Sequence, residues 1–273
     1  MFVFSFIGGL ISPYEQDKFF YADKTIRREF AAVIKNTEFR YSSADDSVFG
    51  LPAQAQAMLA IQQQKDGFTY RDNRFTLTKE AAKEKLGVND GRPLIVSFWG
   101  SLGASGMNAQ MADMLALEAG KEPFHHIHGA GKSGYAAVLE ALTEKGVDLK
   151  DHPSLQVREY IYDMAPVMRA ADLVICRAGA STVSELTALG VPAIMVPSPY
   201  VTNNHQEKNA RALETHGGVE VLLEQDSSGQ ALFQTAAGIL RDDARREAMA
   251  SAMAELGIRD AAQRIYETVQ ELL

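Results

Sequence analysis

The segment Cys176-Arg177-Ala178-Gly179-Ala180-Ser181-Thr182-Val183-Ser184-Glu185 decides the fold, because it joins a buried strand to a helix. The apolar run 172–176 that leads into it is typical of a strand inside a parallel sheet. Small residues in the turn let a ligand approach the backbone closely. The helix behind them offers unpaired N–H groups and the positive end of a dipole, which suit a phosphate. Glu185 lies in the first turns of that helix, close enough to reach a sugar hydroxyl. The segment therefore predicts a nucleotide-sugar site.

The composition is that of a globular protein with one large domain or two ordinary ones. The chain has 273 residues, of which 46% are hydrophobic and 23% charged, and this balance can bury a core. A net charge of -8 argues against a nucleic-acid binder that acts through a broad basic face. A local phosphate site remains compatible with that charge, since it needs only one or two donors.

Compartment and membrane signals are few. The single cysteine, Cys176, rules out an internal disulfide and fits a reducing, cytoplasmic compartment, where we interpret it as a buried strand-end residue. The apolar opening 1–11 has no basic segment before it, so we expect no secretory signal. It is also shorter than the ~20 residues that span a bilayer, which favours a core strand.

From residue 94 onward the sequence alternates between strand and helix patterns. The expected strands are 94–99, 123–128, 155–161, 172–176, 193–196 and 219–223. The expected helices are 107–119, 134–145, 165–170, 182–189, 205–215, 229–256 and 260–273. Apolar strands between amphipathic helices predict an α/β fold, a Rossmann-like parallel sheet covered on both faces. Right-handed crossovers place the carboxyl ends of all strands at one edge, where ligands of such sheets bind.

The first third of the chain follows no such pattern. Residues 21–35, 53–65 and 78–86 are expected helices, and Thr78 is a plausible N-cap for the last one. No run of strand–helix units precedes residue 88. The sequence therefore predicts an atypical or truncated N-terminal region, 1–88, followed by a nucleotide-sugar domain, 89–273.

Glycine-rich turns follow two of the expected strands. Gly100-Ser101-Leu102-Gly103-Ala104 is either a loop that meets a phosphate or sugar, or an ordinary strand–helix turn. The segment His128-Gly129-Ala130-Gly131-Lys132-Ser133 lacks the first glycine of a P-loop, so a plain turn is favoured over ATP or GTP binding. Strand alternation puts His126 and His128 on one face, and we favour core or edge histidines over a zinc site, because no cysteine or carboxylate with ligand spacing lies nearby.

Two further segments lie at the same predicted edge. Asn204-His205-Gln206-Glu207-Lys208-Asn209-Ala210 opens a helix, and its amide side chains can both donate to and accept from sugar hydroxyls. Tyr160-Ile161-Tyr162-Asp163-Met164 ends the third expected strand, where the backbone can hold a flat base beside Ile161 and Met164. The alternative for this second segment is an ordinary core strand end.

Together these segments resemble the MurG-type transferases, which attach N-acetylglucosamine to lipid I in bacterial cell-wall synthesis. The matching elements are Ser97-Phe98-Trp99-Gly100-Ser101-Leu102-Gly103-Ala104, Glu159-Tyr160-Ile161-Tyr162-Asp163-Met164, Ala171-Asp172-Leu173-Val174-Ile175-Cys176-Arg177-Ala178-Gly179-Ala180 with Thr182-Val183-Ser184-Glu185, and His205-Gln206-Glu207-Lys208-Asn209-Ala210. Their order and spacing fit from about residue 91 onward. The resemblance implies the C-terminal, donor-binding domain of a glycosyltransferase-B fold.

The resemblance also implies roles for individual residues. Ile161 and Met164 would lie by the uracil, and Glu185 would take the ribose hydroxyls. Ala180, Ser181 and Thr182, with Ser101, would surround the diphosphate, and His205 and Gln206 would read the GlcNAc hydroxyls. The full set of implied substrate-binding residues is Ser101, Gly103, Ile161, Met164, Arg177, Gly179, Ala180, Ser181, Thr182, Glu185, His205, Gln206 and Asn209. The family needs no divalent metal in its site and no cofactor. Helix N-termini and hydroxyls would stabilise the leaving UDP.

The first third departs from that family. Members carry an N-terminal domain with a Gly-Gly-x-Gly-Gly-His loop thought to supply the base, and no such loop is present here, so no catalytic residue is assigned. We expect an inverting transferase that uses UDP-GlcNAc and a lipid-linked muramyl-peptide acceptor at the inner face of the cell membrane. A second subunit that supplies the acceptor domain is one form of this hypothesis. The alternatives are a non-catalytic UDP-sugar-binding module or truncated product, and an epimerase of the same fold.

Overall fold

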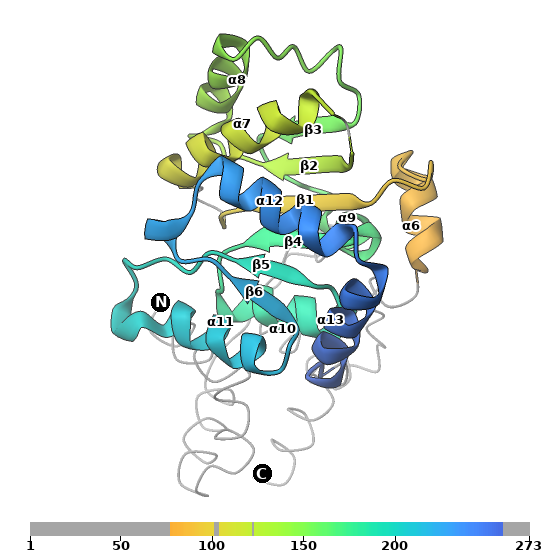
Figure 1. Cartoon of the computed structure of the whole chain (residues 1–273), viewed down its shortest axis with the longest axis vertical. Coiled ribbons are helices and arrows are strands. Elements are labelled where there is room, and N and C mark those ends of the chain that lie inside the picture. The colour runs from red at the N-terminus through yellow and green to blue at the C-terminus, as the bar shows by residue number, and fades with distance from the viewer. Residues whose placement is uncertain (1–76, 101–103, 122, 259–273) are drawn as a thin grey trace, which may run out of the picture.

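The strands of this chain are short and largely buried on both faces, as a parallel sheet between two helix layers requires. The computed structural model describes residues 77–100, 104–121 and 123–258. In chain order its elements are α6 (Lys79–Leu86), β1 (Leu94–Phe98), α7 (Ser105–Ala119), β2 (His125–Gly129), α8 (Tyr135–Glu144), β3 (Leu155–Arg158), α9 (Met164–Ala170), β4 (Leu173–Cys176), α10 (Ala180–Leu189), β5 (Ala193–Met195), η2 (Thr202–Asn204), α11 (His205–Thr215), β6 (Val219–Val221), η3 (Glu224–Asp226), α12 (Gly229–Leu240) and α13 (Asp243–Glu255) (Figure 1).

The six strands form one sheet in the order β3-β2-β1-β4-β5-β6, and every neighbouring pair is parallel. The predicted parallel sheet is therefore confirmed. The strand order reverses direction between β1 and β4, so this sheet has its topological switch point there. The strands run toward the left of Figure 1, and their carboxyl ends meet at that edge. Ligands of open α/β sheets bind at that edge, outside the switch point.

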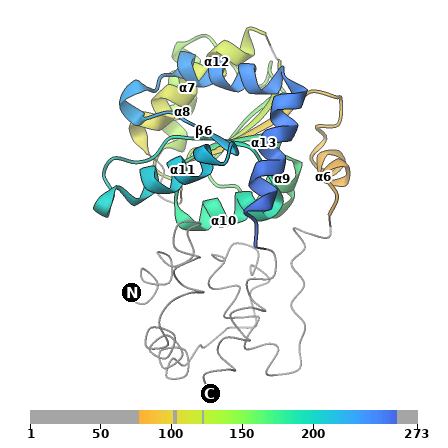
Figure 2. The ribbon, with the colours of Figure 1, turned by 60° about the horizontal axis from the view of Figure 1, so that its bottom comes forward.

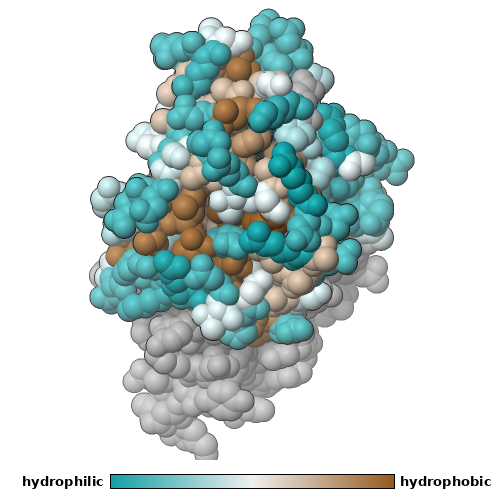
Figure 3. Space-filling view, viewed as in Figure 1, coloured by the Kyte–Doolittle hydropathy of each residue, from teal (hydrophilic) through white to brown (hydrophobic). Residues whose placement is uncertain are grey.

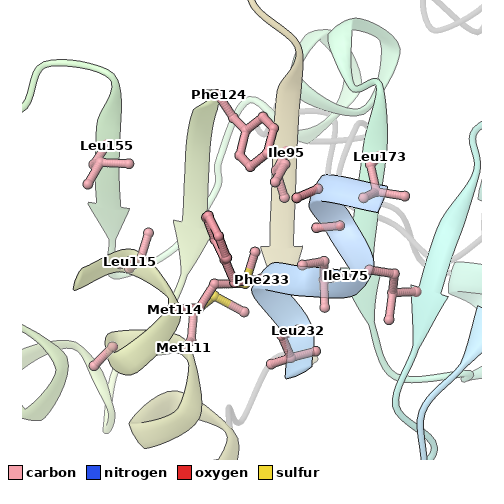
Figure 4. Close-up of a cluster of buried hydrophobic side chains, with 14 of the residues drawn as sticks. Ile95, Met111, Met114, Leu115, Phe124, Leu155, Leu173, Ile175, Leu232 and Phe233 are labelled. Carbon is pink, nitrogen blue, oxygen red and sulfur yellow. The ribbon is translucent and has the colours of Figure 1, made fainter. Parts of the chain in front are cut away.

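Strand alternation divides the core into two layers. Ile95, Ile175 and Ile194 point to the side of α7, α8 and α12, which we call the α7 face. Their neighbours Val96 and Val174 point to the opposite side, toward α9, α10 and α11, which we call the α10 face. Figure 2 shows α7 and α12 on one side of the sheet and α9 and α10 on the other. The cluster in Figure 4 belongs to the α7 face, where the side chains of α7 and α12 meet the strands.

Helix α6 is capped and anchored as its sequence indicates. The hydroxyl of Thr78 accepts a hydrogen bond from Ala81 N at 3.2 Å, so the predicted N-cap is confirmed. Lys79 and Lys83 lie 2.7 and 2.6 Å from the carboxylate of Asp172, which also accepts from Leu94 N. Burial raises the pKa of Asp172, but the two lysines outweigh it and hold that pKa below its ordinary value. This cluster ties α6 to the amino edge of β1 and β4.

Two expected elements end earlier than their patterns indicate. The strand expected over 155–161 stops at Arg158, because its partner β2 ends at Gly129, the residue paired with Arg158. The helix expected over 229–256 is two helices, α12 and α13. Asp242 leaves the helical conformation at φ -109 and caps α13 by accepting from Arg245 N at 2.9 Å.

Strand β6 lies at one edge of the sheet and is paired on one side only among the described residues. Its Glu220 forms an ion pair with Arg245 of α13, which places charge on that edge. Figure 3 shows apolar side chains at the surface between α11 and α12, where β6 lies, and Val221 and Leu222 are partly exposed there. No helix in the described ranges has the length and hydropathy to cross a bilayer. The expected strand within 1–11 and the expected helices 21–35, 53–65 and 260–273 lie outside the described residues.

Candidate functional site

The turns that follow β1 and β4 meet at the topological switch point. Phe98 at the end of β1 is paired with Cys176 at the end of β4. The chain leaves β1 through Trp99 and Gly100, and leaves β4 through the turn 177–179. Two of the predicted site residues, Ser101 and Gly103, belong to the first turn and lie outside the described residues.

The turn after β4 opens directly into α10. Gly179 precedes the helix in an extended conformation, and its carbonyl accepts the first intrahelical bond from Val183 N at 3.0 Å. A Cβ added at Gly179 would meet no atom within 4 Å, so the space beside this backbone is open. Ala180, Ser181 and Thr182 form the first turn and are half-buried. Their N–H groups cannot be satisfied within the helix, and such groups at a positive dipole end bind anions.

Glu185 lies in the second turn of α10 and is half-buried. It is four residues beyond Ser181, so the two side chains share one face of the helix. A carboxylate there is one helical turn away from the N–H groups of the first turn. This spacing suits a ribose that is attached to a diphosphate held at the helix start.

Arg177, which follows β4, contacts residues that follow three other strands, β1, β5 and β6, and so braces these strand ends. Its guanidinium Nη1 lies 2.6 Å from Glu224 Oε2, at an angle that does not make a hydrogen bond, and donates to Val196 O at 3.0 Å. The same group lies over the ring of Trp99, 5.8 Å from its centroid. Arg177 was predicted as a substrate contact, and the structure places it in this brace. Its positive charge is matched by Glu224, and its plane is fixed by Trp99.

The two side-chain partners of Arg177, Trp99 and Glu224, were not identified from the sequence. Trp99 and Glu224 are far from Arg177 in sequence, and neither belongs to a glycine-rich turn. The indole Nε1 of Trp99 is buried, and it has no hydrogen-bond partner in the part of the chain that the structure describes. The only available signal was the placement of Trp99 directly before Gly100-Ser101 at a strand end.

The segment predicted to hold the base follows the end of β3 and packs against β2. Ile161 is in the loop after β3 and is 3% exposed, and Met164 is the first residue of α9. A Cβ added at Gly129, the last residue of β2, would lie 3.2 Å from Ile161 Cδ1. Gly129 and Ile161 are therefore in close contact, and we call this pair the Gly129–Ile161 wall. Tyr160 and Tyr162 form an exposed ring pair on the same loop, with centroids 5.0 Å apart.

The start of α11 is tied to this edge by its amide side chains. Gln206 Oε1 accepts from Ser198 N at 2.9 Å, which joins α11 to the turn after β5. Asn209 is 5% exposed, and its Nδ2 donates to Ala178 O at 3.1 Å, which joins α11 to the turn before α10. His205 is exposed, and its Nδ1 lies 2.9 Å from Thr202 O.

The chain enters α11 through unusual backbone. Asn203 and Asn204 have φ of 55° and 52°, in the left-handed region that asparagine tolerates better than most residues. Backbone of this kind is uncommon and clusters at ligand sites. It turns the start of α11 toward the sheet edge, so His205 and Gln206 lie at the same edge as the α10 start.

The structure therefore brings the described site residues to one edge of the sheet. The turn before α10 is linked to α11 through Asn209 and to the ends of β5 and β6 through Arg177. His126 and His128 of β2 lie elsewhere, within the core of the α7 face, and they bond to side chains of that core. In the described ranges no group of three or more His, Cys, Asp or Glu side chains is arranged to hold a metal ion.

Cys176 is likewise a core residue. It ends β4 fully buried on the α10 face. Burial raises the pKa of its thiol to about 12, so the group is an inert thiol at neutral pH. The interpretation of Cys176 as a buried strand-end residue is confirmed.

Comparison with known proteins matches this domain. The model of the glycosyltransferase family 28 C-terminal domain matches residues 94–265. A protein of Acetivibrio thermocellus named UDP-N-acetylglucosamine–N-acetylmuramyl-(pentapeptide) pyrophosphoryl-undecaprenol N-acetylglucosamine transferase is 40% identical over 207 residues, which are 76% of this chain and 55% of that protein. The protein of the same name from Listeria monocytogenes is 39% identical over 194 residues, 71% of this chain and 52% of the relative. The chain thus spans about half the length of the curated relatives it matches.

Solved structures give the same result. The crystal structure of Acinetobacter baumannii MurG superposes with a TM-score of 0.58 at 28% identity and covers 67% of this chain and 53% of that one. A UDP-N-acetylglucosamine 2-epimerase from Listeria monocytogenes superposes at 0.52 with 17% identity, over 71% of this chain and 51% of that one, which shows a common fold alone. The predicted glycosyltransferase-B C-terminal fold and the resemblance to MurG are confirmed. The chain belongs to glycosyltransferase family 28, and residues 94–265 are the C-terminal domain of that family in its MurG type.

Proposed function

We propose that residues 89–273 bind UDP-GlcNAc and serve as the donor domain of an inverting transferase. The acceptor would be a lipid-linked muramyl peptide, as the names of the relatives state for those proteins. In this proposal the region 1–88 is a separate part of the chain. A transferase with such an acceptor works at the cytoplasmic face of the membrane.

The observation that carries the proposal is the start of α10 at the switch point. A small-residue turn, an open space at Gly179 and unpaired first-turn N–H groups suit a diphosphate. Glu185 one turn further along suits the ribose, and the Gly129–Ile161 wall suits a flat base. His205 and Gln206 on α11 stand at the same edge and suit the sugar hydroxyls.

The chemistry that this arrangement supplies is stabilisation of the leaving group. As the sugar departs, negative charge grows on the diphosphate, and preorganised N–H donors at a helix start stabilise it. Ser181, Thr182 and Ser101 would add hydroxyl donors. Transfer also needs a base near the acceptor hydroxyl, in line with the anomeric carbon. No residue of the described part is assigned to that role, so the acceptor half of the reaction rests on residues 1–88 or on a partner chain.

Isothermal titration tests the donor site directly. We expect UDP and UDP-GlcNAc to bind the purified chain, and Glu185→Ala to weaken both by roughly 1–3 kcal/mol through lost ribose hydrogen bonds. Glu255→Ala, at the exposed end of α13, is a matched control and should bind like the parent chain. If the parent binds neither ligand, the proposal fails. If Glu185→Ala binds as tightly as the parent, Glu185 is outside the site.

Transfer itself needs a second assay. Radiolabelled GlcNAc transfer to a lipid I analogue by the purified chain alone would show an active enzyme. UDP-GlcNAc binding without turnover would favour a donor domain that needs a partner, or a non-catalytic binding module. Incubation with UDP-GlcNAc alone would reveal an epimerase through epimerised or hydrolysed sugar.

A further inference from the structure

A chain of buried polar side chains crosses the otherwise apolar α7 face. Glu118, His126, Ser97 and His128 are each 0% exposed, and Asn108 is 4% exposed. We call these five residues the buried relay. Glu118 and Asn108 lie at opposite ends of α7, about 15 Å apart along the helix axis. The relay therefore runs from the amino side of the sheet to its carboxyl edge.

Each member of the relay touches the next at hydrogen-bond distance. His126 Nδ1 lies 2.9 Å from Glu118 Oε2, and its Nε2 lies 2.8 Å from Ser97 Oγ. The same hydroxyl lies 2.8 Å from His128 Nδ1. His128 Nε2 lies 3.3 Å from Asn108 Oδ1, and Asn108 Nδ2 donates to Ala130 O at 2.8 Å.

One direction of donation satisfies every link. Burial, together with the charge of His126, lowers the pKa of His128 to about 3, so its ring is neutral at pH 7. Because the Asn108 amide donates to Ala130 O, its Oδ1 must accept from Nε2–H of His128. His128 Nδ1 then accepts from the Ser97 hydroxyl, whose oxygen accepts from Nε2–H of His126. Glu118 and the other nitrogen of His126 share the remaining proton.

The last link ends at the predicted base site. Ala130 follows Gly129, and its N–H donates to Arg158 O at 2.9 Å just before the loop that carries Ile161. Gly129 is in close contact with Ile161. The relay thus fixes a carbonyl one residue beyond the Gly129–Ile161 wall. Directed hydrogen bonds specify the position of this carbonyl more sharply than apolar contacts do, because their geometry is fixed.

A glycine makes room for that last link. A Cβ added at Gly134 would lie 2.0 Å from Asn108 Nδ2 and 2.7 Å from Ala130 O. Gly134 has φ of -99, so its backbone does not require glycine, and the demand for space comes from the Asn108 amide and the Ala130 carbonyl to which it donates. From the sequence, Gly134 is expected only as the first residue of the helix 134–145.

We propose that the buried relay is a positioning device, in which Asn108 and His128 hold the Gly129–Ile161 wall in the shape that accepts a nucleobase. The proposal rests on the proposed function, because it assigns that wall to the base of UDP. None of the five residues needs to touch the ligand. Their effect reaches it through Ala130, Gly129 and Ile161.

The first test compares ligand affinity with stability. Asn108→Leu removes the bonds to His128 and Ala130 at nearly constant volume, and Gly134→Ala displaces the Asn108 amide. We expect both variants to lose about tenfold or more in UDP affinity when measured well below their unfolding temperatures. Met249→Ala, in α13 and away from the carboxyl edge, is the matched control for a destabilised core, and Gly238→Ala, with open space beside it, is the control for Gly134→Ala. Both controls should keep the parent affinity.

The outcomes separate the inference from the proposed function. A parent chain that does not bind UDP contradicts the proposed function. A parent that binds UDP while Asn108→Leu and Gly134→Ala bind it equally well overturns the positioning role alone. Equal losses in Asn108→Leu and Met249→Ala at matched stability would also overturn it, because they would reduce the relay to ordinary core packing.

A second readout tests the direction of the relay without any ligand. Long-range nitrogen–proton spectra of the histidine rings should show His128 neutral with its proton on Nε2, and His126 with a proton on Nε2. Glu118→Gln can donate to His126 Nδ1 and should keep this pattern, whereas Glu118→Leu should lose it along with UDP affinity. A proton on Nδ1 of His128 in the parent chain would overturn the proposed relay.

Discussion

The two faces of the sheet satisfy their buried polar side chains in different ways. On the α10 face Thr187 donates to Val183 O within its own helix and Asn209 donates to Ala178 O, so each of these two buried side chains bonds to backbone. On the α7 face five side chains bond to one another in a relay that spans the layer. Apolar packing tolerates small slips, whereas a relay of directed bonds accepts one register of α7 on the sheet. The polar contacts of the α7 face therefore fix where α7 lies on the sheet, whereas the α10 face is held mainly by apolar packing.

The largest test of this comparison breaks the buried contact between Glu118 and His126. Glu118→Leu leaves the His126 ring buried without its hydrogen-bond partner, and we expect the free energy of unfolding to fall by about 3–5 kcal/mol. Urea denaturation measures this change. Adding His126→Phe should recover much of it, since removal of both partners is far less costly than removal of one. If Glu118→Leu changes stability by less than the Thr187→Val control, the α7 face does not depend on its polar groups.

The second test uses pH. His128 is neutral in the folded chain because burial, and then the charge of His126, lower its pKa from 6.5 to about 3. Below pH 6.5 the unfolded chain binds a proton that the folded chain does not, so this contribution to stability is full above pH 6.5 and is lost as the pH falls toward 3.

The pH effect is measured as a difference between two proteins. At pH 5 we expect the parent chain to have lost about 2 kcal/mol more stability than His128→Gln, relative to pH 7.5. Urea denaturation at several pH values gives both curves. The groups facing His128 are Ser97 and Asn108, with His126 and Glu118 beyond the serine, and they are the same in both proteins. Parallel curves would show that His128 takes up its proton without cost.

The third test concerns the α10 face. Asn209→Leu leaves Ala178 O without its partner and should cost about 1–3 kcal/mol, because a buried carbonyl is left unsatisfied. Thr187→Val removes only a bond within one helix and should cost about 0.5 kcal/mol or less. Thermal unfolding of the two variants gives the comparison. Similar losses would mean that the link between α11 and the turn before α10 contributes no more to stability than a bond within one helix.

The smallest effect sharpens the role of two glycines. Gly238 lies inside α12 with no atom within 4 Å of an added Cβ, so Gly238→Ala should stabilise the chain by about 0.5–1 kcal/mol. Gly134→Ala should destabilise it, because the added methyl group meets Asn108. Circular dichroism melts of the two proteins decide the sign of each change. Two changes of the same sign would remove the distinction.

The sequence predicts what local patterns control. Strand alternation placed His126 and His128 on one face, small residues marked the start of α10, and Thr78 marked the start of α6, and each of these depends on residues close in the chain. The pairing of Arg177 with Trp99 and Glu224 depends on the strand order, which no periodicity states. The buried relay could not be predicted from the sequence for the same reason. Its partners Glu118 and Asn108 look like ordinary helix residues until α7 is set on the sheet.

Amide resonances provide the most direct test of the central claim, which is that the carboxyl edge at the switch point holds UDP. The chain labelled with nitrogen-15 is titrated with UDP, and shifts are followed residue by residue. We expect the largest shifts in the first turn of α10, at Gly100 and Gly129, and at the start of α11. Shifts confined to the amino edge, around Leu94 and Asp172, would contradict it.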